Sequence, residues 1–142
     1  MTSITVTRML QKALGLQCVV ASNPIGSALR VVFDSASFPS DTSWRIVLED
    51  CWRWRRGAHI LASSEMLGGK AGQLRAAVAT LTGRRIVEVE ADDLVGALAL
   101  KFDDDSVLET AGCAQGPEWV MVAGDGTTAR LSIPEGLVIS IG

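Results

Sequence analysis

Apolar and polar residues alternate through much of the chain, most clearly in residues 81–109. Residues 85–91 and 97–102 both show the period-two pattern of half-buried strands. Their apolar faces are expected to hold Val87 and Val89 in the first run and Leu98, Leu100 and Phe102 in the second. Acidic residues follow each run and interrupt it, so we predict three antiparallel strands in this stretch.

An earlier part of the chain repeats this pattern. With Gly15 set against Gly83, residues 18–21 match residues 86–89. The apolar residues Leu29, Val31 and Phe33 then match Leu98, Leu100 and Phe102, and Asp34 or Asp103 follows. A hairpin alone cannot bury its apolar face, so two such units are expected to supply each other's core. The pattern predicts an α+β fold, mainly antiparallel β, with two tandem β-meander units at residues 14–66 and 81–123.

Helical spacing occurs between the two units. Residues 70–81 carry an i, i+3, i+4, i+7 stripe that ends before Gly83, and we predict a helix there that joins the units. Residues 5–14 fit a short helix, and the alternative is an extended N-terminal strand through residues 4–7. A C-terminal hairpin is predicted at 118–141, and its last apolar strand must be paired or covered.

Tryptophan and arginine alternate in the first unit, from Trp52 to Arg55. On a strand, this order puts Trp52 and Trp54 on one face and the two arginines on the other. Three interpretations remain open: a core Trp pair with solvated arginines, a protein-binding hot spot, or a base-stacking surface for single-stranded nucleic acid.

Composition and charge narrow the class of protein and the kind of partner. The chain has 142 residues, of which 48% are hydrophobic, and suits one globular domain spanning 1–142. Its net charge of −3 disfavours nucleic acid as a partner. Residues 1–70 hold eight basic and five acidic side chains, whereas the remainder holds five and eleven. If the halves form opposite sides, the molecule is dipolar; the alternative is an ordinary solvated surface.

No motif for catalysis or metal binding stands out. The single histidine, His59, falls in a predicted strand at 58–63, and the Asp103–Asp105 run lacks the spacing of a calcium loop. Cys18, Cys51 and Cys113 show no CxxC spacing, so we predict neither a disulfide framework nor a zinc site, and no cofactor. No stretch has the length of an apolar membrane span, so a cytoplasmic protein without membrane contact is expected.

Short motifs in residues 14–123 give the chain a resemblance to one group of proteins. They are the Leu-x-Val-x-Phe or Leu-x-Leu-x-Phe run of each unit, the Trp44-Arg45 and Trp52-Arg53 pairs, and the Phe102-Asp103-Asp104 and Pro117-Glu118-Trp119 runs. With these motifs the chain resembles small β-rich bacterial proteins, some of which are immunity partners of polymorphic or contact-dependent growth-inhibition toxins. The resemblance implies a cytoplasmic immunity protein, not an enzyme, that occludes the active site of a toxin domain, often a nuclease.

A toxin of this kind is basic, so we expect an acidic surface to bind it. The predicted contact residues are the acids of the second unit, with two tryptophans as apolar anchors: Glu88, Glu90, Asp92, Asp93, Asp103, Asp104, Asp105, Trp52 and Trp54. The chain itself is expected to be a monomer or weak homodimer. The alternative functions are a small-molecule-binding module or an enzyme with a pocket between the β units, and a homo-oligomer paired through residues 137–141.

Overall fold

The structure is a computed structural model that describes residues 5–23, 28–35, 40–64, 76–92, 97–110, 118–132 and 136–140. These residues form one helix, a short helical segment at residues 76–79 and eleven strands. They are α1 (Val6–Gln11), β1 (Gln17–Ser22), β2 (Leu29–Asp34), β3 (Trp44–Asp50), β4 (Trp52–Arg56), β5 (His59–Ser63), β6 (Ile86–Asp92), β7 (Ala97–Phe102), β8 (Ser106–Thr110), β9 (Glu118–Val122), β10 (Thr128–Ser132) and β11 (Gly136–Ser140). The strands predicted at 58–63, 85–91 and 97–102 agree with β5, β6 and β7 to within one residue.

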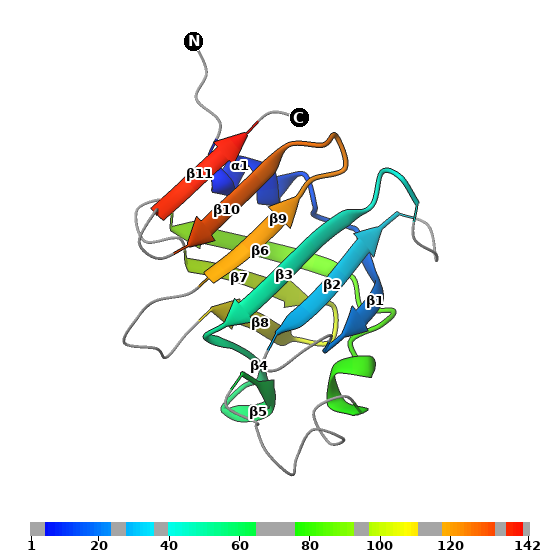
Figure 1. Ribbon diagram of the computed structural model, residues 1–142. Coiled ribbons are helices and arrows are strands. Elements are labelled where there is room, and N and C mark those ends of the chain that lie inside the picture. The colour runs from blue at the N-terminus through cyan, green and yellow to red at the C-terminus, as the bar shows by residue number, and fades with distance from the viewer. Residues whose placement is uncertain are drawn as a thin grey trace.

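The strands form two antiparallel sheets packed face to face. Sheet A has the order β1-β2-β3-β9-β10-β11, and sheet B has the order β5-β4-β8-β7-β6. In Figure 1 sheet A lies in front, and the strands of sheet B run across it from behind, as in orthogonal sheet packing. The prediction of a mainly antiparallel β protein is therefore confirmed.

The chain crosses between the sheets twice. β1–β3 form a meander in sheet A and β6–β8 form one in sheet B, but β3 pairs with β9 and β4 pairs with β8. The strands that follow each meander thus complete the opposite sheet. The two predicted units are therefore interlocked in space and are not two bodies side by side.

Apolar side chains from the facing sides of both sheets fill the core. Leu98, Leu100 and Phe102 are at most 5% exposed, as their alternation predicts. Phe33 of β2 stacks on Phe102 of β7, with ring centroids 6.2 Å apart and an interplanar angle of 21°. The two strands aligned in the sequence therefore contact each other at the centre of the sandwich.

The predicted facing of β6 was wrong at Val87, which is 46% exposed. The β6–β7 register shifts between Ile86 and Glu88, so Val87 lies outside the regular pairing, and Ile86 takes the inward position at 1% exposure. A β-bulge inserts one unpaired residue and reverses the alternation around it. β1 has the same kind of shift, between Cys18 and Val20.

Reciprocal hydrogen bonds join the starts of β1 and β6. Gly15 N donates to Ile86 O (2.9 Å), and Gly83 N donates to Cys18 O (2.7 Å). Ile86 N donates to Leu16 O (2.9 Å), and Cys18 N donates to Arg84 O (2.7 Å). The four bonds form two matching pairs: adding 68 to the residue number in the first segment and subtracting 68 in the second turns one bond of a pair into the other. One β-bridge, between Gln17 and Arg85, lies among these bonds.

A helical segment precedes each of these junctions. The open choice for residues 5–14 is decided in favour of the helix: Thr5 Oγ1 accepts a hydrogen bond from Arg8 N (3.1 Å) as its N-cap, and Val6, Met9 and Leu10 are buried. Of the helix predicted at 70–81, residues 76–79 are helical and 80–83 form a turn; residues 70–75 lie outside the described residues. No helix in the described part of the chain is long and apolar enough to span a membrane.

Candidate functional site

The outer face of sheet B, which points away from sheet A, carries most of the charged residues singled out in the sequence. Side chains alternate along each strand, so Trp52 of β4 and Leu100 of β7 point inward and the residues next to them point outward. The outward residues are Arg53 and Arg55 on β4, Val107 and Glu109 on β8, Ala97, Ala99 and Lys101 on β7, and Glu88, Glu90 and Asp92 on β6. Acidic residues therefore occupy one edge of this face, and arginines occupy the opposite part.

Glu109 is held by both outward arginines of β4. Its Oε1 lies 2.7 Å from Arg53 Nε and 2.6 Å from Arg55 Nε. Burial raises the pKa of Glu109, but the hydrogen bonds from Arg55 and Arg53 outweigh burial and leave this pKa below its usual value. This carboxylate is therefore ionised and fixed in position.

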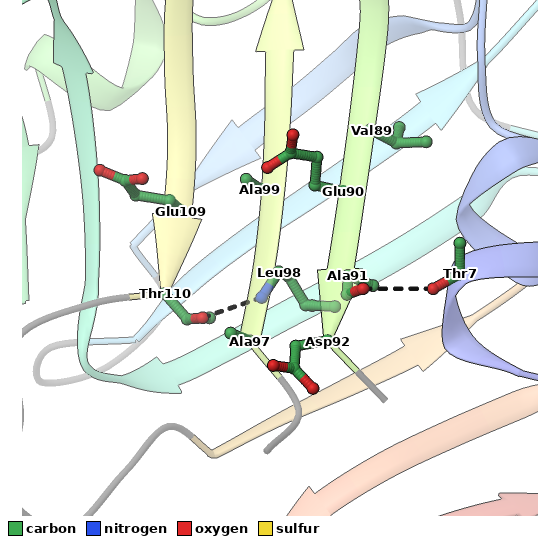
Figure 2. A pocket seen from close by; sticks show the side chains of 10 residues that line it. All are labelled: Thr7, Val89, Glu90, Ala91, Asp92, Ala97, Leu98, Ala99, Glu109 and Thr110. Atoms are coloured by element: carbon green, nitrogen blue, oxygen red, sulfur yellow. Dashed lines mark hydrogen bonds between the residues drawn. The ribbon is translucent and has the colours of Figure 1, made fainter. Parts of the chain in front are cut away.

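A groove of about 490 Å³ lies beside Glu109, at the end of the sheet where β7 begins (Figure 2). Ala97 and Ala99 are small side chains on the middle strand, between carboxylates from the two flanking strands. The lining residues are Thr7, Val89, Glu90, Ala91, Asp92, Ala97, Leu98, Ala99, Glu109 and Thr110. The groove thus combines a shallow floor with carboxylates on both walls, of which Glu109 is paired with Arg53 and Arg55 and the β6 acids form the negative wall.

Two hydrogen bonds fix the margins of the groove. Thr7 Oγ1 of α1 donates to Ala91 O at 3.2 Å, and Thr110 Oγ1 of β8 accepts from Leu98 N at 2.9 Å (Figure 2). A smaller hollow of about 160 Å³ continues the groove toward Glu88 and Lys101. Because regular sheet backbone carries it, the site is preorganised for a ligand of matching shape.

The predicted acids do not form one patch. Asp92 pairs with Ala97 at one end of the β6–β7 hairpin, whereas Phe102, which precedes Asp103, pairs with Ile86 at the other end. Six residues of strand separate these ends by about 20 Å. Asp92 therefore groups with Glu88 and Glu90, while Asp103–Asp105 form a separate turn. Asp93 lies outside the described residues.

Asp104 serves that turn. Its carboxylate lies 2.6 Å from Arg56 Nη2 and 3.3 Å from Arg84 Nε, and it accepts a 2.5 Å hydrogen bond from Ser106 Oγ. Asp105 lies 3.9 Å from Lys101 Nζ and adopts a left-handed φ of 67°. These contacts make Asp104 a structural ion-pair centre and not a surface available to a partner.

The prediction that Trp52 and Trp54 anchor a binding partner was wrong. They are 1% and 3% exposed and belong to the core, the alternative that the alternation left open. Trp54 Nε1 is buried and has no hydrogen-bond partner among the residues that the structure describes. Neither indole reaches the surface, so neither contributes to a binding face.

The dipolar interpretation also fails, because charges from both halves of the sequence share sheet B. Arg53 and Arg55 come from the basic half, and Glu109 comes from the acidic half. The alternation predicted that these arginines face away from the tryptophans, but not which acid they meet. That contact depends on the pairing of β4 with β8, strands more than fifty residues apart.

The cysteines differ from the prediction. Cys51 is disulfide-bonded, with a φ of 61° and 3% exposure. Cys18 is free and buried, and its burial raises the pKa of the thiol to about 12. A disulfide requires two Cα atoms within about 7 Å of each other, a condition that spacing along the chain does not reveal.

Other chemistry has little support in the described ranges. His59 lies exposed at the start of β5. Among the residues that the structure describes, no three His, Cys, Asp or Glu side chains come together as a metal site. Comparisons with protein-family models, with curated proteins and with solved structures give no match for this chain.

Proposed function

We propose that this chain is a protein-binding domain whose outer face of sheet B receives a basic segment of a partner. One observation carries the proposal: Glu88, Glu90 and Asp92 are all exposed at two-residue spacing along β6, beside a groove with an alanine floor. Glu90 lies directly opposite Ala99, so no cation faces it across the β6–β7 pair. A lysine or arginine side chain of a partner fits this charge and this shallow space.

The partner we propose is a bacterial toxin domain, with this chain as its immunity protein. The family resemblance in residues 14–123 favours this class of partner. An acidic strip that covers a cationic active site excludes an anionic substrate and speeds association by electrostatic steering. The contact set is centred on Glu90, which lies opposite Ala99, with Glu88 opposite Lys101 beside it. Asp104 is left out because it is held by Arg56 and Arg84, and the tryptophans are left out because they are buried.

The disulfide at Cys51 changes the proposed location. Disulfides persist in oxidising compartments and are rare in the cytosol. We therefore propose that the chain meets its partner outside the cytoplasm, in place of the cytoplasmic location predicted from the sequence. That location fits a toxin directed at the cell envelope better than a nuclease.

One cavity that described residues line between the two sheets bears on the small-molecule alternative. The cavity lined by Ile46, Leu48 and Leu98 measures about 10 Å³, which is space for about one water molecule. Ligand pockets of folded proteins are usually at least ~300 Å³. The open outer groove is therefore the better candidate, and an open groove suits a protein side chain.

The proposal is tested with Glu90→Lys and a matched reversal, Asp103→Lys. Both acids are exposed, Glu90 on β6 beside the groove and Asp103 in the turn that follows β7. A partner captured by the wild-type chain at low salt and eluted by high salt is purified and titrated against each variant. We expect Glu90→Lys to bind roughly 10-fold more weakly at about 50 mM salt, a difference that shrinks near 1 M because salt screens exposed charges.

Asp103→Lys is expected to bind like the wild type. Equal binding by all three proteins would place the partner on another surface, and failure to capture any salt-sensitive partner would contradict a protein-binding function. For the immunity role, co-expression with the partner's toxic domain should restore growth with the wild type and Asp103→Lys, but less with Glu90→Lys. A partner without toxicity would contradict immunity and leave protein binding in place.

We also infer that the two halves of the chain are copies of one α-β-β-β-β unit. The reciprocal hydrogen bonds at Gly15 and Gly83, and the bulges after Cys18 and Ile86, support this inference. Trp52 and Trp119 add to it, since each enters the sheet opposite the final strand of a meander, at Thr110 and Leu48 respectively. In this arrangement, the strands that carry the groove belong to the second copy, and Thr7 at its margin belongs to the first.

A further inference from the structure

We propose that two copies of the chain associate through β11, as antiparallel neighbours across a two-fold axis, and extend sheet A across the dimer. β11 is the last strand of sheet A, and Figure 1 shows it at the outer edge of that sheet. An edge strand presents unpaired backbone N–H and C=O groups, which another strand can complete. The proposal concerns sheet A and does not depend on the function proposed for sheet B.

Two of the four sheet edges are already engaged by their own chain. Gly83 N and Arg84 O bond the backbone of Cys18 in β1. On β6, Gly15 N and Leu16 O bond Ile86, and Thr7 of α1 donates to Ala91 O. Both strands also carry a bulge, and β6 is acidic, all of which are devices that discourage edge pairing.

Within the described residues two edges remain, β5 and β11, and they differ in regularity. The pairing of β5 with β4 shifts register between Trp54 and Arg55. β11 pairs with β10 through five consecutive residue pairs, from Thr128–Ser140 to Ser132–Gly136, without any shift. Charged residues and proline usually protect an exposed edge strand from pairing, and β11 carries neither.

The side chains of β11 fit a second copy of the same strand. Val138, its central residue, is 51% exposed, whereas Leu137 and Ile139 are half-buried and pack against the core. A two-fold axis at Val138 places Val138 opposite itself and Leu137 opposite Ile139. The apolar inner face of sheet A then continues without a register conflict, which an arbitrary partner strand does not guarantee.

Charge does not oppose this pairing. Among the described residues that lie in register with Val138 across sheet A, the nearest charged one is Arg130, directly opposite it on β10. In the dimer, the two Arg130 positions are three strand spacings apart, or about 14 Å. That separation exceeds the screening length of about 8 Å at physiological salt.

The test replaces Val138 by charges of either sign. Val138→Lys and Val138→Glu each place like charges opposite each other at the axis, so each variant should dimerise at least ~10-fold more weakly than the wild type in sedimentation equilibrium. When the two variants are mixed in equal amounts, opposite charges meet at the axis and dimers should form again. With one variant mass-tagged, native mass spectrometry should show that these dimers are heterodimers. Ile60→Lys is the matched control, because Ile60 is 43% exposed on the β5 edge, and it should dimerise like the wild type.

Unchanged melting temperatures establish that the variants are folded, as expected at a half-exposed position. A wild-type chain that stays monomeric at every concentration overturns the proposal. So does a Val138→Lys variant that dimerises like the wild type. A mixture that stays monomeric while the wild type dimerises overturns the symmetric register at Val138.

Discussion

Asp104 shows how one carboxylate can be needed for the fold rather than for binding. Burial raises the pKa of Asp104, but hydrogen bonds from Ser106 and Arg56 and the charge of Arg84 outweigh it, and the pKa falls from 3.8 to about 2. A carboxyl group whose pKa is lower in the folded than in the unfolded state stabilises the fold above the unfolded pKa. This contribution is lost as pH falls toward about 2.

Replacing Asp104 by Asn should therefore lower the free energy of unfolding by about 2 kcal/mol near neutral pH. Arg56 and Arg84 lose their shared counter-ion, and Ser106 keeps only a neutral acceptor. Urea denaturation between pH 7 and pH 2 measures this, and the difference from the wild type should shrink below pH 4. Asp103→Asn, at an exposed neighbour, is the control. A pH-independent difference would mean that ionisation of Asp104 does not matter.

At the scale of elements, the junction between β1 and β6 determines how the two sheets meet. Gly15 and Gly83 each donate a backbone hydrogen bond to the opposite segment, with φ values of 87° and 93°. Residues with a Cβ rarely adopt such angles, so glycine is needed at both turns for conformational reasons. An added Cβ at either position would meet nothing within 4 Å.

Gly83→Ala should lower the free energy of unfolding by about 1–2 kcal/mol through backbone strain alone. Gly83→Asn should cost less, since asparagine tolerates left-handed conformations better than alanine does. Thermal and chemical denaturation of both variants provide the comparison. Equal stability of Gly83→Ala and the wild type would show that the turn does not require a left-handed residue.

At the scale of the whole molecule, the disulfide at Cys51 bears on both stability and location. A cross-link stabilises a fold mainly by restricting the unfolded chain, typically by about 2–4 kcal/mol. Cys18 does not take part, because it is free and buried within β1. The molecule is thus expected to depend on the redox state of its compartment.

The chain has three cysteines. In denaturant, we expect thiol titration to give one free thiol before reduction and three after it. Reduction should lower the free energy of unfolding by about 2–4 kcal/mol, and Cys51→Ser should remove this sensitivity. Three free thiols in protein purified without reductant would contradict the disulfide and restore the cytoplasmic prediction.

Much of the local structure could be predicted from the sequence alone. Strands of alternating pattern, such as Ala97–Phe102, and the outward direction of Arg53 and Arg55 depend on the two-residue period of a strand, which is a local property. The alignment of Gly15 with Gly83 is likewise visible in the residues themselves. Val87 was misjudged because a bulge changes that period by one residue without any sign in composition.

The sequence by itself determined which residues form strands. Except beside the bulge, it also determined which apolar side chains of the central strands face inward. The reason is that hydrophobic burial acts on each residue according to its position in the two-residue period. Tertiary structure alone decided which strands that are distant in the sequence are neighbours. The contact of Glu109 with Arg53, the separation of Asp92 from Asp104, the bond at Cys51 and the groove over Ala99 all depend on pairings between distant segments. Such pairings follow from the packing of the whole chain, and no local pattern encodes them.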